Sequence, residues 1–98
     1  MQEKELRILS GLLQKARDRN ELETLLRGVL TPQEIDEIVL RWELLVRLLN
    51  GETQRQISQK LGVSLGKIAR GSRLLKYGTP DFRELVERII GGNPEPDR

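Results

Sequence analysis

The sequence predicts an all-α protein that contains a helix-turn-helix unit. Apolar residues recur at three- and four-residue spacings along most of the chain, and no segment alternates in the way typical of a strand. Residues 53–76 contain six Lys or Arg and no Asp or Glu, whereas the rest of the chain has 11 basic and 15 acidic residues and so carries −4. Gly62 divides this basic stretch into two short helical patterns, which is the sequence form of a helix-turn-helix.

Two helices are predicted before residue 31. Residues 3–18 form the first, and its apolar face consists of Leu6, Ile8, Leu9, Leu12, Leu13 and Ala16. Asn20 suits the N-cap of the second helix, with Glu23 as its capping-box partner. We expect this helix to end near residues 28–30.

A Thr-Pro pair predicts the start of a third helix. Thr31 can cap it, Pro32 suits its first position, and Glu34 completes a capping box. The helix should run to about Asn50 and stop at Gly51. Its second half is apolar around most of its circumference, which predicts burial at the centre of the protein or against a second subunit.

Both helices of the basic stretch carry start signals. Thr53 and Gln56 form a capping box for the first, Gly62 ends it, and Ser64 caps the second. Ser58 supplies the small side chain that is needed where the two helices cross. The apolar positions expected to hold them together are Ile57, Leu61, Val63 and Ile68.

A sixth helix is predicted after the basic stretch. Tyr77-Gly78 breaks the preceding helix, and Thr79-Pro80 begins the next. Its expected buried face consists of Phe82, Leu85, Val86, Ile89 and Ile90. Residues 91–94 should end it. We therefore expect one domain over residues 1–92 and a disordered tail over residues 93–98.

Composition excludes several classes of function. The chain has no Cys and no His, so it lacks disulfides, thiolate sites and the commonest general base and metal ligand. There is no Gly-rich phosphate loop and no convincing carboxylate cluster, so neither an enzyme nor a bound metal or cofactor is expected. No apolar run approaches the roughly 20 residues of a membrane span, and the start does not read as a signal peptide. These features predict a soluble cytoplasmic protein that does not interact with membranes.

The basic stretch predicts binding to double-stranded DNA, because its charge attracts phosphates whatever the base sequence. The N-terminal turn of a recognition helix reads bases in the major groove. That turn presents Leu65, Gly66, Lys67 and Ala69. Leu65 can contact a thymine methyl group, Gly66 permits close approach, and Lys67 can reach a guanine edge or a phosphate. Phosphate contacts are expected from Gln54, Ser64, Arg73 and Lys76.

The chain resembles the tryptophan (trp operon) repressor family. The resemblance rests on L-T-P at 30–32, Arg41, L-L-x-G-E at 48–52, Q-R at 54–55, L-G at 61–62, I-x-R-G-S at 68–72 and L-K at 75–76. It implies a six-helix fold in an intertwined homodimer that binds operator DNA, with L-tryptophan as corepressor. It also implies that Arg55 contacts bases, for which bidentate binding to guanine fits its chemistry.

The same resemblance implies a ligand site. Arg41 and Arg70 match the two arginines that sandwich the indole ring of tryptophan, and Gly71 matches the small residue beside the ring. Leu30 and Thr31 match the segment, from the partner subunit, that meets the ligand's amino group. The expected pocket is therefore shared between two chains.

Two positions depart from the family pattern. Leu74 stands where the family has a serine that helps bind the amino group, and Lys67 stands where it has a threonine facing ligand and DNA. A regulator that responds to another ligand, or to none, is thus an alternative. A helical module that docks on acidic proteins is a second. By residue type alone, Arg41 would pair with Glu37, and Arg70 would bind a phosphate.

Overall fold

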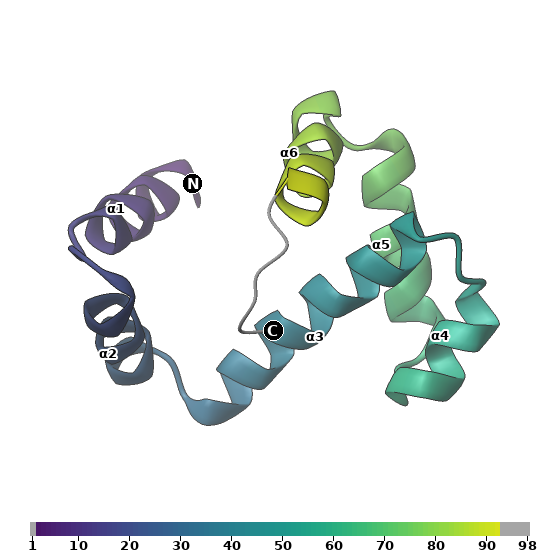
Figure 1. Cartoon of the computed structure of the whole chain (residues 1–98), viewed down its shortest axis with the longest axis horizontal. Helices are drawn as coiled ribbons and strands as arrows, with labels where there is room; N and C mark the ends of the chain where they lie inside the picture. The colour runs from purple at the N-terminus through teal and green to yellow at the C-terminus, as the bar shows by residue number, and fades with distance from the viewer. Residues whose placement is uncertain (1, 93–98) are drawn as a thin grey trace. The chain divides into compact units, whose positions relative to one another are not determined.

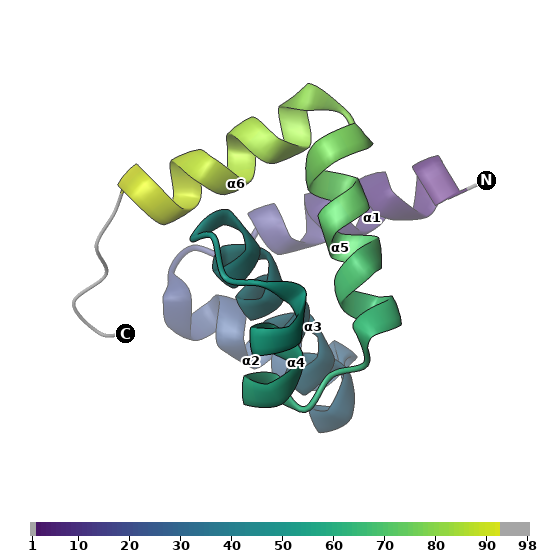
Figure 2. The same cartoon turned by 90° about the vertical axis from the view of Figure 1, so that its right-hand side faces the viewer.

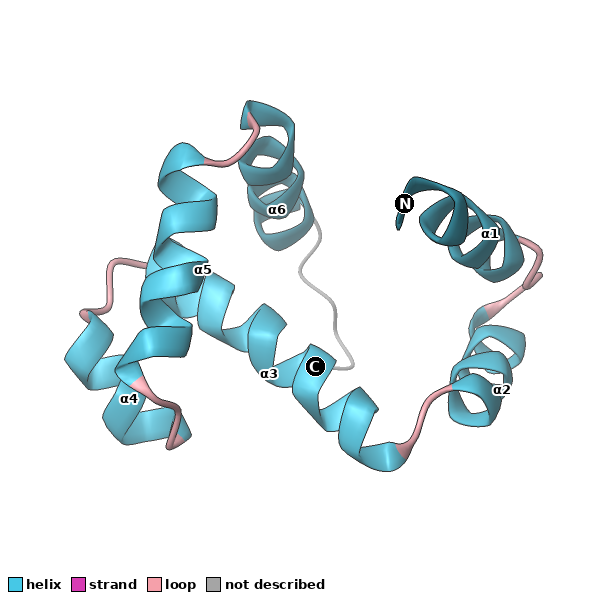
Figure 3. Cartoon of the chain, turned by 180° about the vertical axis from the view of Figure 1, so that it is seen from behind, coloured by secondary structure: helices cyan, strands magenta, loops and turns pink. Residues whose placement is uncertain are grey.

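The computed structural model describes residues 2–92, and all regular structure in this range is helical (Figure 1, Figure 3). The helices are α1 (Gln2–Gln14), α2 (Arg19–Val29), α3 (Pro32–Leu49), α4 (Gln54–Leu61), α5 (Leu65–Tyr77) and α6 (Pro80–Gly92). The prediction of six helices and no strand is confirmed for these residues. None of the helices is long and apolar enough to cross a membrane. The tail predicted over residues 93–98 lies outside the described range.

The chain divides into two compact units, residues 1–37 and residues 38–98. The first contains α1, α2 and the start of α3, and neither α1 nor α2 has a buried residue. The apolar face predicted for α1 is present, but its own unit leaves much of it exposed, since Leu6 is 63% exposed and Ile8 is 61% exposed. This unit therefore carries apolar surface that its own residues do not bury.

The boundaries of α1 and α2 differ from the prediction. α1 ends at Gln14 instead of residue 18, and the N-cap of α2 is Asp18, whose carboxylate accepts from the backbone N–H of Glu21. The prediction of Asn20 as the cap was wrong. Asp18 is an equally suitable cap that comes earlier, and Glu21 reinforces it by accepting from the backbone N–H of Arg17 at 2.9 Å.

The start and end of α3 follow the prediction. The Thr31 hydroxyl accepts from the Glu34 N–H at 3.1 Å, and the Glu34 carboxylate accepts from the Thr31 N–H at 2.9 Å. Pro32 is the first helical residue and Leu49 is the last. Gly51 follows with φ of +88°, a conformation that glycine adopts without steric cost.

The core of the second unit lies between α3, α4 and α5. Its buried cluster consists of Leu44, Ile57, Val63 and Ile68, and both isoleucines are fully buried. Of the four residues predicted to hold the basic stretch together, Ile57, Val63 and Ile68 are thus in the buried core. Leu61 is only partly buried and packs against it, and α3 adds Leu44. Gly71 lets α5 approach α3 closely, since a Cβ atom there would lie 2.6 Å from Leu44 Cδ2. The missing side chain is a condition for this packing.

The last helix, α6, begins at Pro80 as predicted and contacts α5 (Figure 2). Only part of its predicted buried face is buried in the single chain. Val86 is 1% exposed, whereas Leu85 is 45% exposed and Ile89 is 46% exposed. Phe82 and Ile90 are partly buried. Like α1, α6 therefore presents apolar side chains that its own unit leaves exposed.

Candidate nucleic-acid interface

The turn between α4 and α5 is fixed by three hydrogen bonds. Gly62 adopts φ of +66°, and its N–H donates to the carbonyl oxygen of Ser58 at 2.9 Å. The Ser58 hydroxyl donates to the carbonyl oxygen of Val63 at 2.8 Å. The Ser64 hydroxyl then caps α5 by accepting from the N–H of Lys67 at 3.3 Å. The turn between α4 and α5 is therefore held by local hydrogen bonds at Gly62, Val63 and Ser64.

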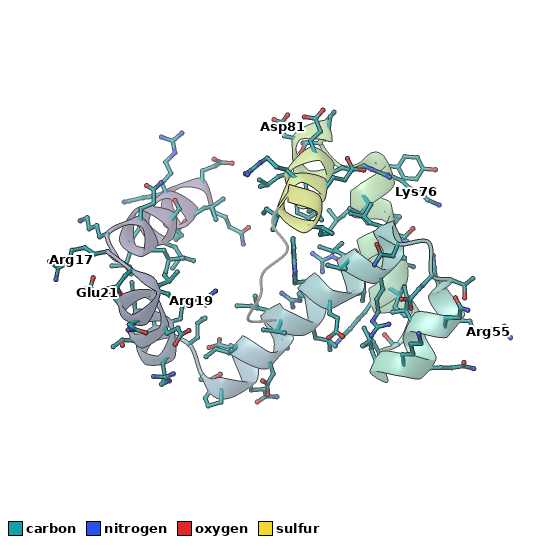
Figure 4. The ribbon with its side chains drawn as sticks, in the orientation of Figure 1. Arg17, Arg19, Glu21, Arg55, Lys76 and Asp81 are labelled. Carbon is teal, nitrogen blue, oxygen red and sulfur yellow. The ribbon has the colours of Figure 1, made fainter. Side chains whose placement is uncertain are left out.

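The start of α4 is held by the predicted capping box. Thr53 and Gln56 exchange hydrogen bonds of 2.9 and 3.1 Å between side chain and backbone. Gln54 and Arg55 are the first two residues of the helix, and both are exposed. The Arg55 side chain projects away from the rest of α4 (Figure 4). Both residues are thus available to an external partner.

The first turn of α5 presents a mixed apolar and cationic surface. Leu65 is 52% exposed, Gly66 and Lys67 are exposed, and Ala69 is partly buried. The turn contains no acidic residue. A partner that contacts this end of α5 would therefore meet methyl groups, an ammonium group and backbone without a side chain.

A hollow of about 320 Å³ connects the start of α4 with the last part of α5. It is lined by Leu48, Leu49, Glu52, Thr53, Gln54, Ser72, Leu75, Lys76 and Arg83. Two predicted phosphate contacts, Gln54 and Lys76, meet in it, and Figure 4 shows Lys76 near the end of α5. Arg73 is exposed on α5 but is not part of its lining. Ser64 to Lys67 lie at the opposite end of α5.

The hollow contains three polar residues to which the sequence interpretation assigned no role, Glu52, Ser72 and Arg83. Ser72 was visible in the R-G-S motif, but nothing in the sequence indicated which way it faces. Arg83 lies in α6, outside the basic stretch, and its guanidinium donates to the Glu87 carboxylate at 3.1 Å. No sequence pattern could have linked Arg83 to the start of α4, because the association depends on the packing of α6 against α5.

The residues that the resemblance assigns to a ligand are distributed over both units. Arg41 on α3 and Arg70 on α5 are exposed, and Leu74 on α5 is 44% exposed. Gly71 is buried against α3. Leu30 and Thr31, which lie between α2 and α3, belong to the first unit. Their joint role in a ligand site stays a prediction.

Residues 2–92 contain no group of three or more acidic, His or Cys side chains that could hold a metal ion.

Glu21, in the first unit, is a carboxyl group with a shifted pKa. Its pKa is lowered mainly by hydrogen bonds from the Arg17 side chain and also by one from the Arg17 backbone, and Figure 4 shows the two side chains together. The hollow of the second unit gathers cationic, hydroxyl and amide groups, which suit phosphate and base edges, together with the carboxylate of Glu52.

Comparison with known proteins places these features in a family. Residues 4–90 match the profile of the family described as Trp repressor protein. A "Trp operon repressor homolog" from Vibrio atlanticus is 42% identical over 83 residues, which cover 84% of this chain and 85% of the relative. One from Vibrio cholerae is 36% identical over 87 residues, covering 88% and 84%. The chain is a member of the Trp repressor family.

Proposed function

We propose that the protein is a homodimeric transcriptional repressor that reads double-stranded DNA with α4 and α5 as a helix-turn-helix. One observation carries the proposal. All six Lys and Arg side chains of residues 53–76 are exposed, and no acidic residue lies among them. Such a surface attracts the phosphate backbone, and the fixed turn between the helices gives it a defined shape. Its place of action would be the cytoplasm.

Reading of the bases is assigned to the first turns of the two helices. Arg55 would bind a guanine edge, Leu65 a thymine methyl group, and Lys67 a guanine or a phosphate. Gly66 and Ala69 would allow the α5 backbone to approach the base pairs. The exposure of Leu65, at 52%, supports a role outside the core.

Phosphate binding is assigned to polar groups at both ends of α5 and at the start of α4. Ser64 lies at the N-terminus of α5, and Arg73 and Lys76 lie near its C-terminus. Gln54 begins α4 and shares the hollow with Lys76. These contacts would position the helices without reading sequence.

A second copy of the chain would cover the apolar side chains that the single chain leaves exposed. These are Leu6, Ile8, Leu9 and Leu12 on α1, Ile38 and Val39 on α3, and Leu85 and Ile89 on α6. Burial of apolar surface is worth roughly 25 cal/mol per Å², so a shared core of these helices would stabilise a dimer. Two reading units would then meet half-sites about 34 Å apart.

Control by L-tryptophan is the finer part of the proposal. The ligand would lie between Arg41 and Arg70, beside Gly71, with Leu30 and Thr31 supplied by the second chain. The match of residues 4–90 to the family supports this site. Leu74 offers no hydrogen bond to the ligand's amino group, which favours the alternative that another ligand, or none, controls DNA binding.

The function is tested by selecting binding sites from random duplexes and measuring their affinity at several salt concentrations. We expect a palindromic site. The logarithm of the binding constant should fall with the logarithm of the salt concentration, with a slope of several units. A slope near zero would contradict DNA binding and favour the protein-interaction alternative. Sedimentation equilibrium should give about twice 11.3 kDa. Calorimetry with millimolar L-tryptophan tests the corepressor, and the absence of heat would exclude it.

A further inference from the structure

Every residue of the linker between α3 and α4, residues 50–53, is held by a hydrogen bond from its backbone N–H. Gly51 N–H donates to the carbonyl of Leu48 at 3.1 Å, and Glu52 N–H donates to the carbonyl of Arg47 at 3.1 Å. With the positive φ of Gly51, these two bonds form the ending known as a Schellman motif. Thr53 follows at once as the cap of α4. Glu52 therefore stands at the junction of two hydrogen-bonded motifs.

The Glu52 side chain binds residues on both sides of this junction. Its two carboxylate oxygens lie 3.2 and 3.1 Å from Nη1 of Arg47, on α3. One of them lies 3.9 Å from Nζ of Lys60, on α4. The Arg47 and Glu52 side chains are 25% and 23% exposed, so their pairing is partly shielded from water. A Schellman motif often has an apolar contact at these two positions, and here an ion pair replaces it.

The location of Glu52 is unfavourable by charge alone. It is the only acidic residue between positions 44 and 80, and it lines the same hollow as Gln54 and Lys76. A carboxylate there repels the phosphate that those residues are proposed to bind. The ion pair between Glu52 and Arg47 is nevertheless well formed. The Glu52 carboxylate raises the pKa of Arg47 above its usual value, chiefly through their hydrogen bonds. The carboxylate of Glu52 must therefore have a role other than the attraction of DNA.

We propose that Glu52 is a positioning residue that fixes the direction in which α4 and α5 leave α3. It acts through Arg47 and Lys60 and touches no base. Without it, the reading residues would sample several directions, and only the affinity for a specific site would suffer. This inference rests on the proposed DNA-binding function and adds a residue to it.

The test is the substitution Glu52→Gln, measured on a selected site and on random duplex at the same salt concentration. Positioning predicts that affinity for the selected site falls by roughly tenfold, as for loss of one charge-assisted hydrogen bond. Affinity for random duplex should stay equal or rise, because a charge that repels phosphate is removed. A parallel rise in both affinities would show that Glu52 is only a repulsive charge and would overturn the inference.

The matched control is Glu43→Gln. Glu43 pairs with the same guanidinium, at 3.4 Å from Nη2 of Arg47, but this pair lies within α3. The Glu43→Gln substitution also removes one negative charge beside Arg47, but it leaves the contacts of Glu52 in place. The ratio of the affinity for the selected site to the affinity for random duplex should therefore stay unchanged. A fall as large as that of Glu52→Gln would overturn the inference.

Hydrogen exchange of the free protein separates this inference from the proposed function. Glu52→Gln should speed exchange of the Glu52 and Gly51 amides, whereas Glu43→Gln should not, with equal melting temperatures showing that both variants fold. If the wild-type protein bound no DNA, the function would fail although the exchange result held. If the wild-type protein bound a specific site and Glu52→Gln kept its preference, the positioning role alone would fail.

Discussion

The hydroxyl of Ser58, on α4, donates a 2.8 Å hydrogen bond to the carbonyl oxygen of Val63, in the turn that leads to α5. The residue that is small enough for the helix crossing thus also satisfies a backbone group of the turn. Val63 is 6% exposed and Ser58 is partly buried, so this hydrogen bond is partly shielded from water. The two properties of Ser58, size and hydrogen bonding, can be separated by mutation.

Ser58→Ala keeps the small size and removes the donor. We expect unfolding free energy to fall by about 1–3 kcal/mol, because the Val63 carbonyl loses its partner in a partly buried setting. Urea unfolding measures the change. Ser10→Ala is the control, since its hydroxyl bonds an exposed carbonyl within α1, and its effect should stay within about 0.5 kcal/mol. Equal losses of unfolding free energy in both variants would show that the hydrogen bond to Val63 stabilises the protein no more than an exposed one.

Gly71→Ala tests the close approach of α5 to α3. The added Cβ would overlap Leu44, which is only 5% exposed and has little room to move. We expect a loss of about 1–3 kcal/mol, as for other overpacked cores. Gly66→Ala, in the same helix but with its nearest foreign atom 4.0 Å away, should be neutral or stabilise by up to about 1 kcal/mol. Thermal unfolding compares the two, and a stable Gly71→Ala protein would contradict the packing argument.

Arg55→Ala and Lys76→Ala should affect DNA binding differently. Arg55 is proposed to read a guanine, so its loss should cost about 1–3 kcal/mol at one base position and relax specificity there. Lys76 is proposed to bind a phosphate, so its loss should weaken all sequences alike and reduce the salt slope by about 1. Affinities for a selected site and its single-base variants distinguish these outcomes. A uniform loss for Arg55→Ala would assign it to the phosphate backbone instead.

Leu65 is expected to contact a thymine methyl group. Replacement of thymine by uracil at that position removes one methyl group, and we expect wild-type binding to weaken by about 0.8 kcal/mol. The Leu65→Ala variant should bind the two duplexes with nearly equal affinity. Fluorescence anisotropy with each thymine replaced in turn locates the contact. If no position responds in the wild-type protein, Leu65 does not read thymine.

Glu21 predicts a pH dependence of stability. Its folded pKa is lowered, mainly by the side chain of Arg17, so its stabilising effect is complete above the unfolded pKa of about 4.3. The effect is lost as pH falls through the lower folded value. The difference in unfolding free energy between the wild-type protein and Glu21→Gln should therefore shrink on acidification from pH 7 to pH 2. A difference that stays constant would show that the carboxylate charge is not involved.

The sequence predicted those features that depend on local chemistry. The caps at Thr31, Thr53 and Ser64 and the end of α4 at Gly62 follow from residue types a few positions apart. The start of α2 was missed because Asp18 and Asn20 are both good caps, and the choice depends on a contact of Glu21 with Arg17 that lies before the helix. Local rules rank such competing signals poorly.

Features that join separate elements were not predictable in the same way. The pair of Arg47 and Glu52 forms because the chain reverses at Gly51, which brings residues five positions apart into contact. The position of Arg83 in the hollow depends on how α6 packs. The exposed side chains of α6 illustrate a third limit, because periodicity identifies Leu85 and Ile89 as apolar without indicating what covers them.

The charge of the basic stretch comes entirely from Lys and Arg, and the chain contains no His. His is the side chain whose ordinary pKa lies between pH 5 and 8. A repressor built in this way keeps the same attraction for DNA when the acidity of its surroundings changes within that range. Under the proposed function, the occupancy of a DNA site would then vary with salt concentration and not with a change of acidity within that range.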